Sequence, residues 1–302
     1  MLPLRHLSGH EHRLFTKALH GGDNNLQDDP DVPGLVDDEG PDEPKADDTP
    51  TGPVADPGGN PMRFVTANIK NTMSSAKTAE DIIKVRGLGS ILLFQEIREG
   101  KSQDLLRQHL PASDWHILPA YEHTTDKIAI KKSLWTVEQV GYYYMAPKPP
   151  TYGRKRYVTL ALVTLTGTNI QFLVTNTHYA AHAWCSHKIS DKAIRKKYWN
   201  RHFGRQQSLV LDARGKGITV IGGGDFNRSA AQGLDKFHSS QDWFKQGRLD
   251  HLFGIPASGG ATYSLQSTQS VALNSDHNAL VAQLSWTAGT NAIKHGYNWG
   301  GA

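Results

Sequence analysis

A strand that is apolar on both faces constrains the fold of this chain more than any other feature. The stretch YVTLALVTL at residues 157–165 has the length of a strand and carries apolar side chains on both faces. Such a strand needs cover above and below, so it belongs in the centre of a packed sheet. The stretch ILLFQE at residues 91–96 is apolar until its polar end. The first stretch therefore predicts a central strand of a sandwich, and the second predicts an apolar strand that ends on polar residues.

The rest of the ordered chain alternates strands with a few helices. Further strands are predicted at 63–68, 127–130, 134–146, 169–179, 218–221, 250–253 and 277–286. Helices are predicted at 77–86, 102–110 and 191–213. Ser102 is the expected cap of the second helix, and a break is expected near Gly204 in the third. This order, without internal repeats, fits two packed sheets flanked by helices.

The first 60 residues differ in composition from the rest of the chain. Residues 21–60 are rich in Asp, Pro and Gly and contain no aromatic residue. They bury too little apolar surface to offset the entropy of ordering, so we predict a disordered acidic tail at 1–60. One ordered domain is predicted at 61–288, followed by a C-terminal tail at 289–302.

The charge of the chain is divided between these parts. Residues 1–60 hold 13 of the 29 acidic and 4 of the 33 basic residues, so residues 61–302 keep 16 acidic and 29 basic residues, a net charge of +13. A strongly basic body favours a polyanionic partner, either nucleic acid or an anionic membrane surface. A soluble protein with scattered lysines is the alternative that charge alone leaves open.

Several classes of protein do not fit this sequence. A single cysteine, Cys185, excludes an intramolecular disulfide. No apolar run approaches the roughly 20 residues of a transmembrane helix. The first residues, MLPLRHLSGHEHRLF, lack the apolar core of a secretory signal. We therefore predict an intracellular monomer without a transmembrane segment.

Polar residues follow the predicted strands where each strand ends. Taken singly, a strand-end Asn or Asp is usually a turn former. Taken together in chain order, they indicate a site: Asn68, Glu96, His178, Asp225 with Asn227, Asp250, and Asp276 with His277.

This set resembles the endonuclease/exonuclease/phosphatase superfamily, which includes deoxyribonuclease I. The matching segments are TANIK, FQEIR, TNTH, GGDFN, RLDH and SDH, in this order between residues 62 and 287. The resemblance implies a four-layer α/β sandwich of two packed, mainly antiparallel sheets flanked by helices. It makes residues 61–288 a catalytic domain whose site lies at one edge of the two sheets.

The resemblance also implies a divalent metal ion. Glu96 binds this ion with help from Asn68, and Asp276 supports it. Carboxylate and carboxamide oxygens suit Mg²⁺, with Mn²⁺ or Ca²⁺ as alternatives. A hard cation is needed because an anionic phosphodiester repels hydroxide.

Catalytic roles follow from the same resemblance. Asp225 and Asn227 orient the attacking water and the phosphoryl oxygens, Asp250 pairs with His277, and His178 contacts the phosphate. Asp126 is a candidate acidic partner of His178. Gly222, Gly223 and Gly224 are expected to let the chain turn sharply and a phosphate approach the backbone.

Basic residues supply the expected substrate contacts. Lys70 and Arg98 resemble phosphate-contacting positions of deoxyribonuclease I, and Arg156 is a further candidate. The helix at 191–213 adds Arg195, Lys196 and Lys197, interleaved with aromatic residues that could stack on bases. A solvated amphipathic helix with core aromatics is the alternative.

The sequence thus predicts a Mg²⁺-dependent phosphodiesterase, a nuclease acting on DNA. A phosphatase or phospholipase C-type enzyme acting on a phosphoinositide or sphingomyelin is the alternative within the superfamily. A catalytically inactive nucleic-acid-binding module is the alternative outside enzymes, although such a module has no need of the complete residue set.

Overall fold

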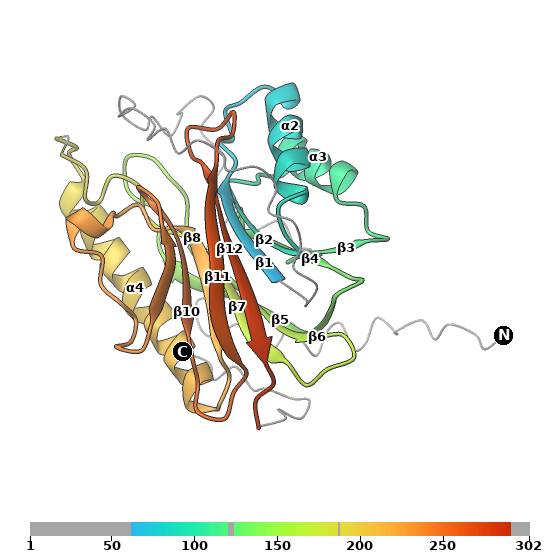
Figure 1. The fold of residues 1–302 in the computed structure, drawn as a ribbon. Helices are drawn as coiled ribbons and strands as arrows, with labels where there is room; N and C mark the ends of the chain where they lie inside the picture. The colour runs from blue at the N-terminus through green and yellow to red at the C-terminus, as the bar shows by residue number, and fades with distance from the viewer. Residues whose placement is uncertain (1–61, 120–123, 187, 291–302) are drawn as a thin grey trace, which may run out of the picture.

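The computed structural model describes residues 62–119, 124–186 and 188–290. The acidic tail predicted at 1–60 and most of the predicted C-terminal tail lie outside these residues. The described residues form two sheets of six strands each (Figure 1).

The first sheet has the strand order β11-β12-β1-β2-β4-β3. Its strands are β1 (Met62–Asn68), β2 (Ile91–Gln95), β3 (Trp115–Leu118), β4 (Lys127–Lys131), β11 (Thr262–Val271) and β12 (Ala279–Thr287). β1 and β2 are parallel, whereas the other neighbouring strands are antiparallel. The parallel pair carries its two carboxyl ends to one edge of the sheet.

The second sheet has the order β5-β6-β7-β8-β10-β9. Its strands are β5 (Trp135–Ala146), β6 (Arg156–Leu165), β7 (Gln171–His178), β8 (Val220–Asp225), β9 (Asp242–Gln246) and β10 (Asp250–Ile255). Again one pair, β7 and β8, is parallel, and the other pairs are antiparallel. The expected hairpin of β6 and β7 is present.

Three hydrophobic clusters define the four layers. One cluster lies between the sheets and includes Phe64, Leu93, Phe172 and Ile221. A second packs α2 (Ser75–Arg86) and α3 (Lys101–His109) on the first sheet. A third packs α4 (Lys192–Gly215) on the second sheet (Figure 1). The predicted four-layer sandwich of mainly antiparallel sheets is confirmed.

Two local predictions about the helices are wrong. Ser102 does not cap α3, because its hydroxyl accepts the backbone N–H of Arg98 at 2.8 Å and Gly100 occupies the cap position. α4 continues through Gly204 over 24 residues, where a break was expected. Packing of its buried face holds the helix together, which outweighs the cost of about 1 kcal/mol for one glycine. None of the described helices is long and apolar enough to cross a membrane.

The three glycines before Asp225 lie inside β8 and not in a turn. A Cβ on Gly222 would lie 2.4 Å from the Phe253 ring, and one on Gly224 would lie 2.0 Å from the Thr177 carbonyl oxygen. Gly224 also has a φ of 139°. The glycines thus let β8 pack closely against its neighbours, and the expectation that they form a turn is wrong.

Candidate active site

The strand-end residues predicted from the sequence gather at one edge of the two sheets. In the second sheet His178 lies opposite Asp225, and Asp225 lies opposite Asp250. These three positions are aligned because β7 and β8 end, and the antiparallel β10 begins, at the same edge. In the first sheet Asn68 ends β1, and Glu96 directly follows β2.

Asp225 is the buried centre of this group. Its Oδ1 accepts the backbone N–H of Asn227 at 2.8 Å, and its Oδ2 accepts the side-chain amide of Asn68 at 3.1 Å. The Nε2 atom of His178 lies 3.4 Å from the same Oδ2. Asp225 therefore links residues from both sheets in one network.

Phe226, between Asp225 and Asn227, fixes the loop that carries these two residues. Its ring is fully buried and stacks on Tyr179 at 4.9 Å, and its carbonyl accepts the indole N–H of Trp199 at 2.6 Å. Asn227 has a φ of 49°, and its side chain donates to the Tyr179 carbonyl at 3.2 Å. α4 thus anchors the loop that carries Asp225 and Asn227 through its contact with Phe226.

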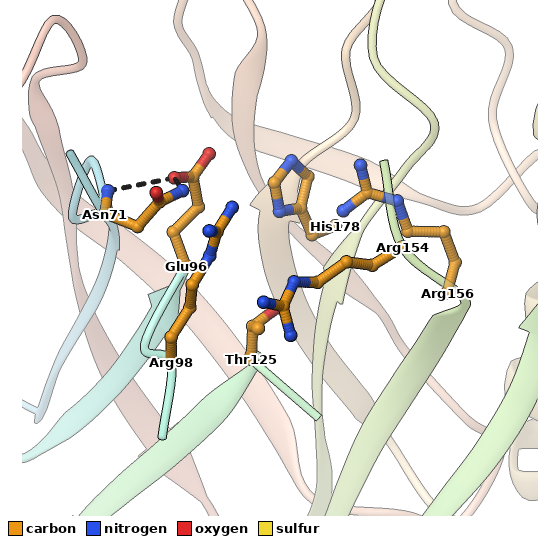
Figure 2. A pocket seen from close by; sticks show the side chains of 7 residues that line it. All are labelled: Asn71, Glu96, Arg98, Thr125, Arg154, Arg156 and His178. Atoms are coloured by element: carbon orange, nitrogen blue, oxygen red, sulfur yellow. Dashed lines mark hydrogen bonds between the residues drawn. The ribbon is translucent and has the colours of Figure 1, made fainter. Parts of the chain in front are cut away.

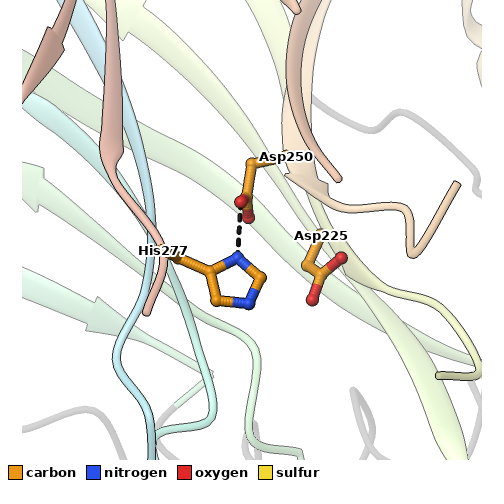
Figure 3. Close-up of side chains that lie close together, drawn as sticks. All are labelled: Asp225, Asp250 and His277. Carbon is orange, nitrogen blue, oxygen red and sulfur yellow. Dashed lines mark hydrogen bonds and ion pairs between the residues drawn. The ribbon is translucent and has the colours of Figure 1, made fainter. Parts of the chain in front are cut away.

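Asp250 and His277 form the predicted pair. The Nδ1 atom of His277 lies 2.6 Å from Oδ2 of Asp250, and both side chains are buried. A bond at Nδ1 makes Nε2 the acceptor of a neutral ring, and the ring lies beside Asp225 (Figure 3). Within the described part of the chain, these three residues form a group whose potential metal-ligand atoms lie within 4.8 Å of one another.

Glu96 is held in a conformation that is rare for its residue type. Its φ is 63°, in the left-handed region, which costs on the order of 1–3 kcal/mol and persists where surrounding bonds impose it. Its carboxylate accepts the backbone and side-chain N–H groups of Asn71. The other oxygen lies 3.5 Å from the amide nitrogen of Asn68.

Asn68 offers an oxygen that fits a cation. Its amide nitrogen lies between Glu96 and Asp225, while its Oδ1 is buried without a hydrogen-bond partner. A buried acceptor without a donor is costly, and a hard cation would satisfy it. The donors at this place, carboxylate and carboxamide oxygens, are those that Mg²⁺ binds.

Asp276 pairs with Lys70 in this structure. The Lys70 ammonium lies 2.7 Å from Oδ2 of Asp276, and Oδ1 accepts the Ser275 hydroxyl at 3.3 Å. Burial opposes the charged form of Asp276, yet the Lys70 bond and nearby His277 lower its pKa. That Asp276 supports the metal ion and that Lys70 contacts a phosphate both stay predictions.

A cavity lies beside this network, between β2, β4, β6 and β7. It is lined by Asn71, Glu96, Arg98, Thr125, Arg154, Arg156 and His178 (Figure 2). Arg98 and Arg156 were predicted as substrate contacts, and the structure brings them together here. Asn71 and Arg154 were not predicted. The basic run GRKR at residues 153–156 was the signal that could have identified Arg154.

The buried groups near the cavity have shifted pKa values. Burial, followed by the positive charge of Arg156, holds the pKa of His178 well below its ordinary value, so the ring is neutral. Burial raises the pKa of Asp126 to about 7, although Arg156 and a hydrogen bond from Thr125 oppose the shift. His178 lies against Asp225 and not in the expected pair with Asp126.

α4 corrects one substrate-binding prediction. The guanidinium of Arg195 is buried and donates to Asp191 at 2.8 Å, to the carbonyls of Ala181 and Tyr152, and to Thr151. Arg195 is therefore a structural residue and cannot contact DNA phosphates from this position. Burial of an arginine with four local acceptors was not visible from spacing along the helix.

The neighbouring side chains of α4 differ in their exposure. Lys197 is exposed, and Lys196 lies 4.8 Å over the Trp184 ring. Trp199 is buried, and Phe203 stacks between it and Phe237. These two aromatics belong to the core, so the expectation that they stack on bases is wrong.

Comparison with known proteins supports the architecture. No family model and no curated protein matches the sequence. An endonuclease/exonuclease/phosphatase from Bacteroides vulgatus has a similar structure, with a TM-score of 0.58 at 16% identity over 76% of this chain and 100% of that chain. The chain has the endonuclease/exonuclease/phosphatase fold.

Two further structures share the fold. D. rerio TDP2, solved with a single-strand DNA product, has a TM-score of 0.55 at 14% identity over 74% of this chain and 99% of that chain. The mannosyl-6-phosphatase Bt3783 of Bacteroides thetaiotaomicron has a TM-score of 0.52 at 16% identity over 74% and 99% of the two chains. Proteins with this fold therefore differ in substrate, and the choice of substrate depends on side chains.

Proposed function

We propose that this protein is a divalent-metal-dependent phosphodiesterase, a nuclease that hydrolyses DNA. The observation that carries the proposal is one continuous network at the sheet edge. It joins Glu96 and Asn68 of the first sheet to Asp225 of the second, beside the Asp250–His277 pair. A protein that only binds nucleic acid has no need of two buried carboxylates, a paired histidine and an unsatisfied amide oxygen together.

Glu96 and Asn68 would hold the metal ion, which supplies charge neutralisation at the phosphoryl group. The positive φ of Glu96 and its bonds to Asn71 fix the carboxylate before substrate arrives. A ligand fixed in advance loses little entropy when the substrate is bound, which favours catalysis. Mg²⁺ is the proposed ion, with Mn²⁺ and Ca²⁺ as alternatives for the same oxygen donors.

The remaining side chains divide the chemistry between them. Asp225 orients an attacking water, and Asn227 donates to a phosphoryl oxygen. A neutral His178 can donate a hydrogen bond without adding charge. Asp250 fixes the tautomer of His277, so that its Nε2 can accept a proton or hydrogen-bond the phosphate near neutral pH.

The proposal that DNA is the substrate rests on the net charge of the chain and on one structurally similar protein. Residues 61–302 carry a net charge of +13, which attracts a polyanion. TDP2 from D. rerio, which shares the fold, was solved with a single-strand DNA product. A phosphomonoesterase is the second candidate, because a mannosyl-6-phosphatase shares the same fold.

The proposal is tested with a substrate panel in the presence of Mg²⁺ or EDTA. Plasmid, single-stranded DNA, RNA, phosphomonoesters, phosphoinositides and sphingomyelin are incubated with the wild type, Glu96→Gln and Glu99→Gln. We expect hydrolysis of DNA that EDTA abolishes and that Glu96→Gln lowers by at least about two orders of magnitude. Glu99, an exposed residue three positions away, is the matched control and should retain activity. Full wild-type activity in EDTA would contradict the metal mechanism, and turnover of monoesters alone would favour the phosphatase.

A further inference from the structure

The cavity beside the catalytic network carries an excess of positive charge. Three of its seven lining residues are arginines, Arg98, Arg154 and Arg156, and Glu96 is the one acid among them. The side chains of these arginines extend from two segments, the one after β2 and the one that leads into β6, towards the space between Glu96 and His178 (Figure 2). If Glu96 holds a metal ion, the remaining charge of the cavity becomes still more positive.

Arg156 indicates that the cavity is built for an anion. Its side chain is 6% exposed, and its Nε–H is buried without a hydrogen-bond partner. A buried cation with an unsatisfied donor is costly unless an anion compensates it. The planar guanidinium matches the oxygens of a phosphate group, which can accept two parallel hydrogen bonds from it.

The cavity and the catalytic pair lie on opposite sides of His178. In the second sheet Arg156 begins β6 on one side of β7, whereas Asp225 and Asp250 belong to β8 and β10 on the other side. In the first sheet Arg98 follows β2, and Thr125 precedes the neighbouring strand β4. His277 precedes β12, which is two strands away from β2 on the other side. Glu96 and His178 line the cavity and also belong to the catalytic network.

We propose that this cavity binds a second phosphate group of the substrate, a terminal dianionic phosphate next to the scissile phosphodiester. The inference rests on the proposed phosphodiesterase function. An internal backbone phosphate carries one negative charge and a terminal phosphate nearly two at neutral pH, which suits three guanidinium groups better. The terminal phosphate can belong to a nucleic-acid end or to a small bisphosphorylated compound.

Two chromogenic substrates test the inference, because they differ in this phosphate alone. They are thymidine 5′-(p-nitrophenyl phosphate) and the same diester with a 3′-phosphate. We expect the wild type to show kcat/KM at least about tenfold higher for the 3′-phosphorylated substrate, the effect of one good charge-assisted hydrogen bond. Arg154→Gln should bring the ratio of the two values towards one. Arg107→Gln, which removes an exposed arginine of α3, should keep the wild-type ratio.

A binding measurement separates this inference from the proposed function. Calorimetry compares thymidine 3′,5′-bisphosphate with thymidine 5′-monophosphate on the wild type, Arg154→Gln and Arg107→Gln. Tighter binding of the bisphosphate that only Arg154→Gln loses supports the cavity even if neither diester is hydrolysed, in which case the proposed function alone fails. Equal binding of both nucleotides, or equal loss of both in Arg154→Gln, overturns the inference.

Oligonucleotides with and without 5′- or 3′-terminal phosphates identify the source of the second phosphate. A gain in kcat/KM with a phosphorylated end points to a nucleic-acid terminus. A gain confined to the mononucleotide pair points to a small bisphosphorylated substrate.

Discussion

The Asp250–His277 pair is in close contact, with 2.6 Å between Oδ2 and Nδ1. Since Asp250 acts through the ring that it orients, the two residues should behave as one unit. We expect Asp250→Asn and His277→Ala each to lower kcat by about two to four orders of magnitude. The double variant should cost little more than the worse single variant. Losses that multiply in the double variant would show that the residues act independently.

Asp126 gives a pH dependence to stability. Its pKa is about 7 in the folded protein and 3.8 ordinarily, so the folded state binds the extra proton between these values. The stabilising contribution of the protonated acid is complete below about pH 4 and is lost as the pH rises through about 7. Asp126→Asn stays neutral throughout. Relative to the wild type, its free energy of unfolding should improve by about 2–3 kcal/mol between pH 5 and pH 8.

Denaturant unfolding at both pH values measures this difference. Asp104→Asn, on the exposed face of α3, controls for the loss of one acid from the chain. An Asp126→Asn variant whose stability follows that of the wild type at both pH values would contradict the shifted pKa.

The resemblance carried by the order of strand-end residues predicted the Asp250–His277 pair, which the structure contains, and a His178–Asp126 pair, which it does not. Strand ends bring five of these side chains to one edge. Asn68, His178 and Asp225 end their strands, Glu96 directly follows β2, and Asp250 begins β10. Contacts within loops were beyond the same reasoning. Asn71 donates to Glu96 from the loop after β1, and Glu96 itself has a positive φ; the sequence reveals neither feature.

Among the secondary-structure elements, apolar strands were predictable and polar edge strands were not. β11 (TYSLQSTQSV) lacks an apolar face, and most of its residues are exposed or half-buried. It becomes a strand because β12 offers it a ladder of backbone hydrogen bonds. Such a strand is determined by its partner, so the apolar pattern of its own sequence carries no signal.

α4 combines a buried structural arginine with the half-buried Lys196 and the exposed Lys197, and substitutions should separate their roles. Arg195→Gln leaves the buried Asp191 without its cation, so we expect the free energy of unfolding to fall by about 3–5 kcal/mol. Lys196→Gln/Lys197→Gln should leave stability nearly unchanged. It should lower the slope of log Kd against log salt for DNA by roughly 0.9 for each lysine that contacts a phosphate. An unaltered slope would make this face a solvated surface without a role in DNA binding.

At the scale of the molecule, the two sheets share one arrangement of parallel and antiparallel strand pairs. Each contains a single parallel pair, β1 with β2 and β7 with β8, and antiparallel strands on both sides of it. Apolar strands in a mixed order predicted two packed sheets, and the resemblance supplied the four layers. The strand order within each sheet did not follow from the sequence, because it depends on which long-range pairings bury the most surface. β10 and β8 pair only after η1 (Ala230–Gln232) and β9 intervene.

The distribution of charge over the whole chain leads to a prediction about residues 1–60. They carry 13 acids and 4 bases, whereas residues 61–302 carry a net charge of +13. Covalent attachment brings these acids near the basic body at an effective concentration of up to about the millimolar range, where they compete with DNA phosphates. Deleting residues 1–60 should therefore tighten DNA binding at low ionic strength. The gain should shrink at high salt, which screens both interactions.

Fluorescence anisotropy with a labelled oligonucleotide measures this effect at about 0.05 M and 0.5 M salt. Between these two salt concentrations the screening length falls several-fold. The matched control keeps the length of the chain and replaces the twelve Asp and Glu residues of segment 23–60 with Asn and Gln. Competition predicts that this variant binds DNA as tightly as the deletion, because only charge has been removed from it. If the full chain, the deletion and the neutralised variant bind equally at low salt, the acidic segment does not compete with DNA, and its charge serves only to keep a basic protein soluble.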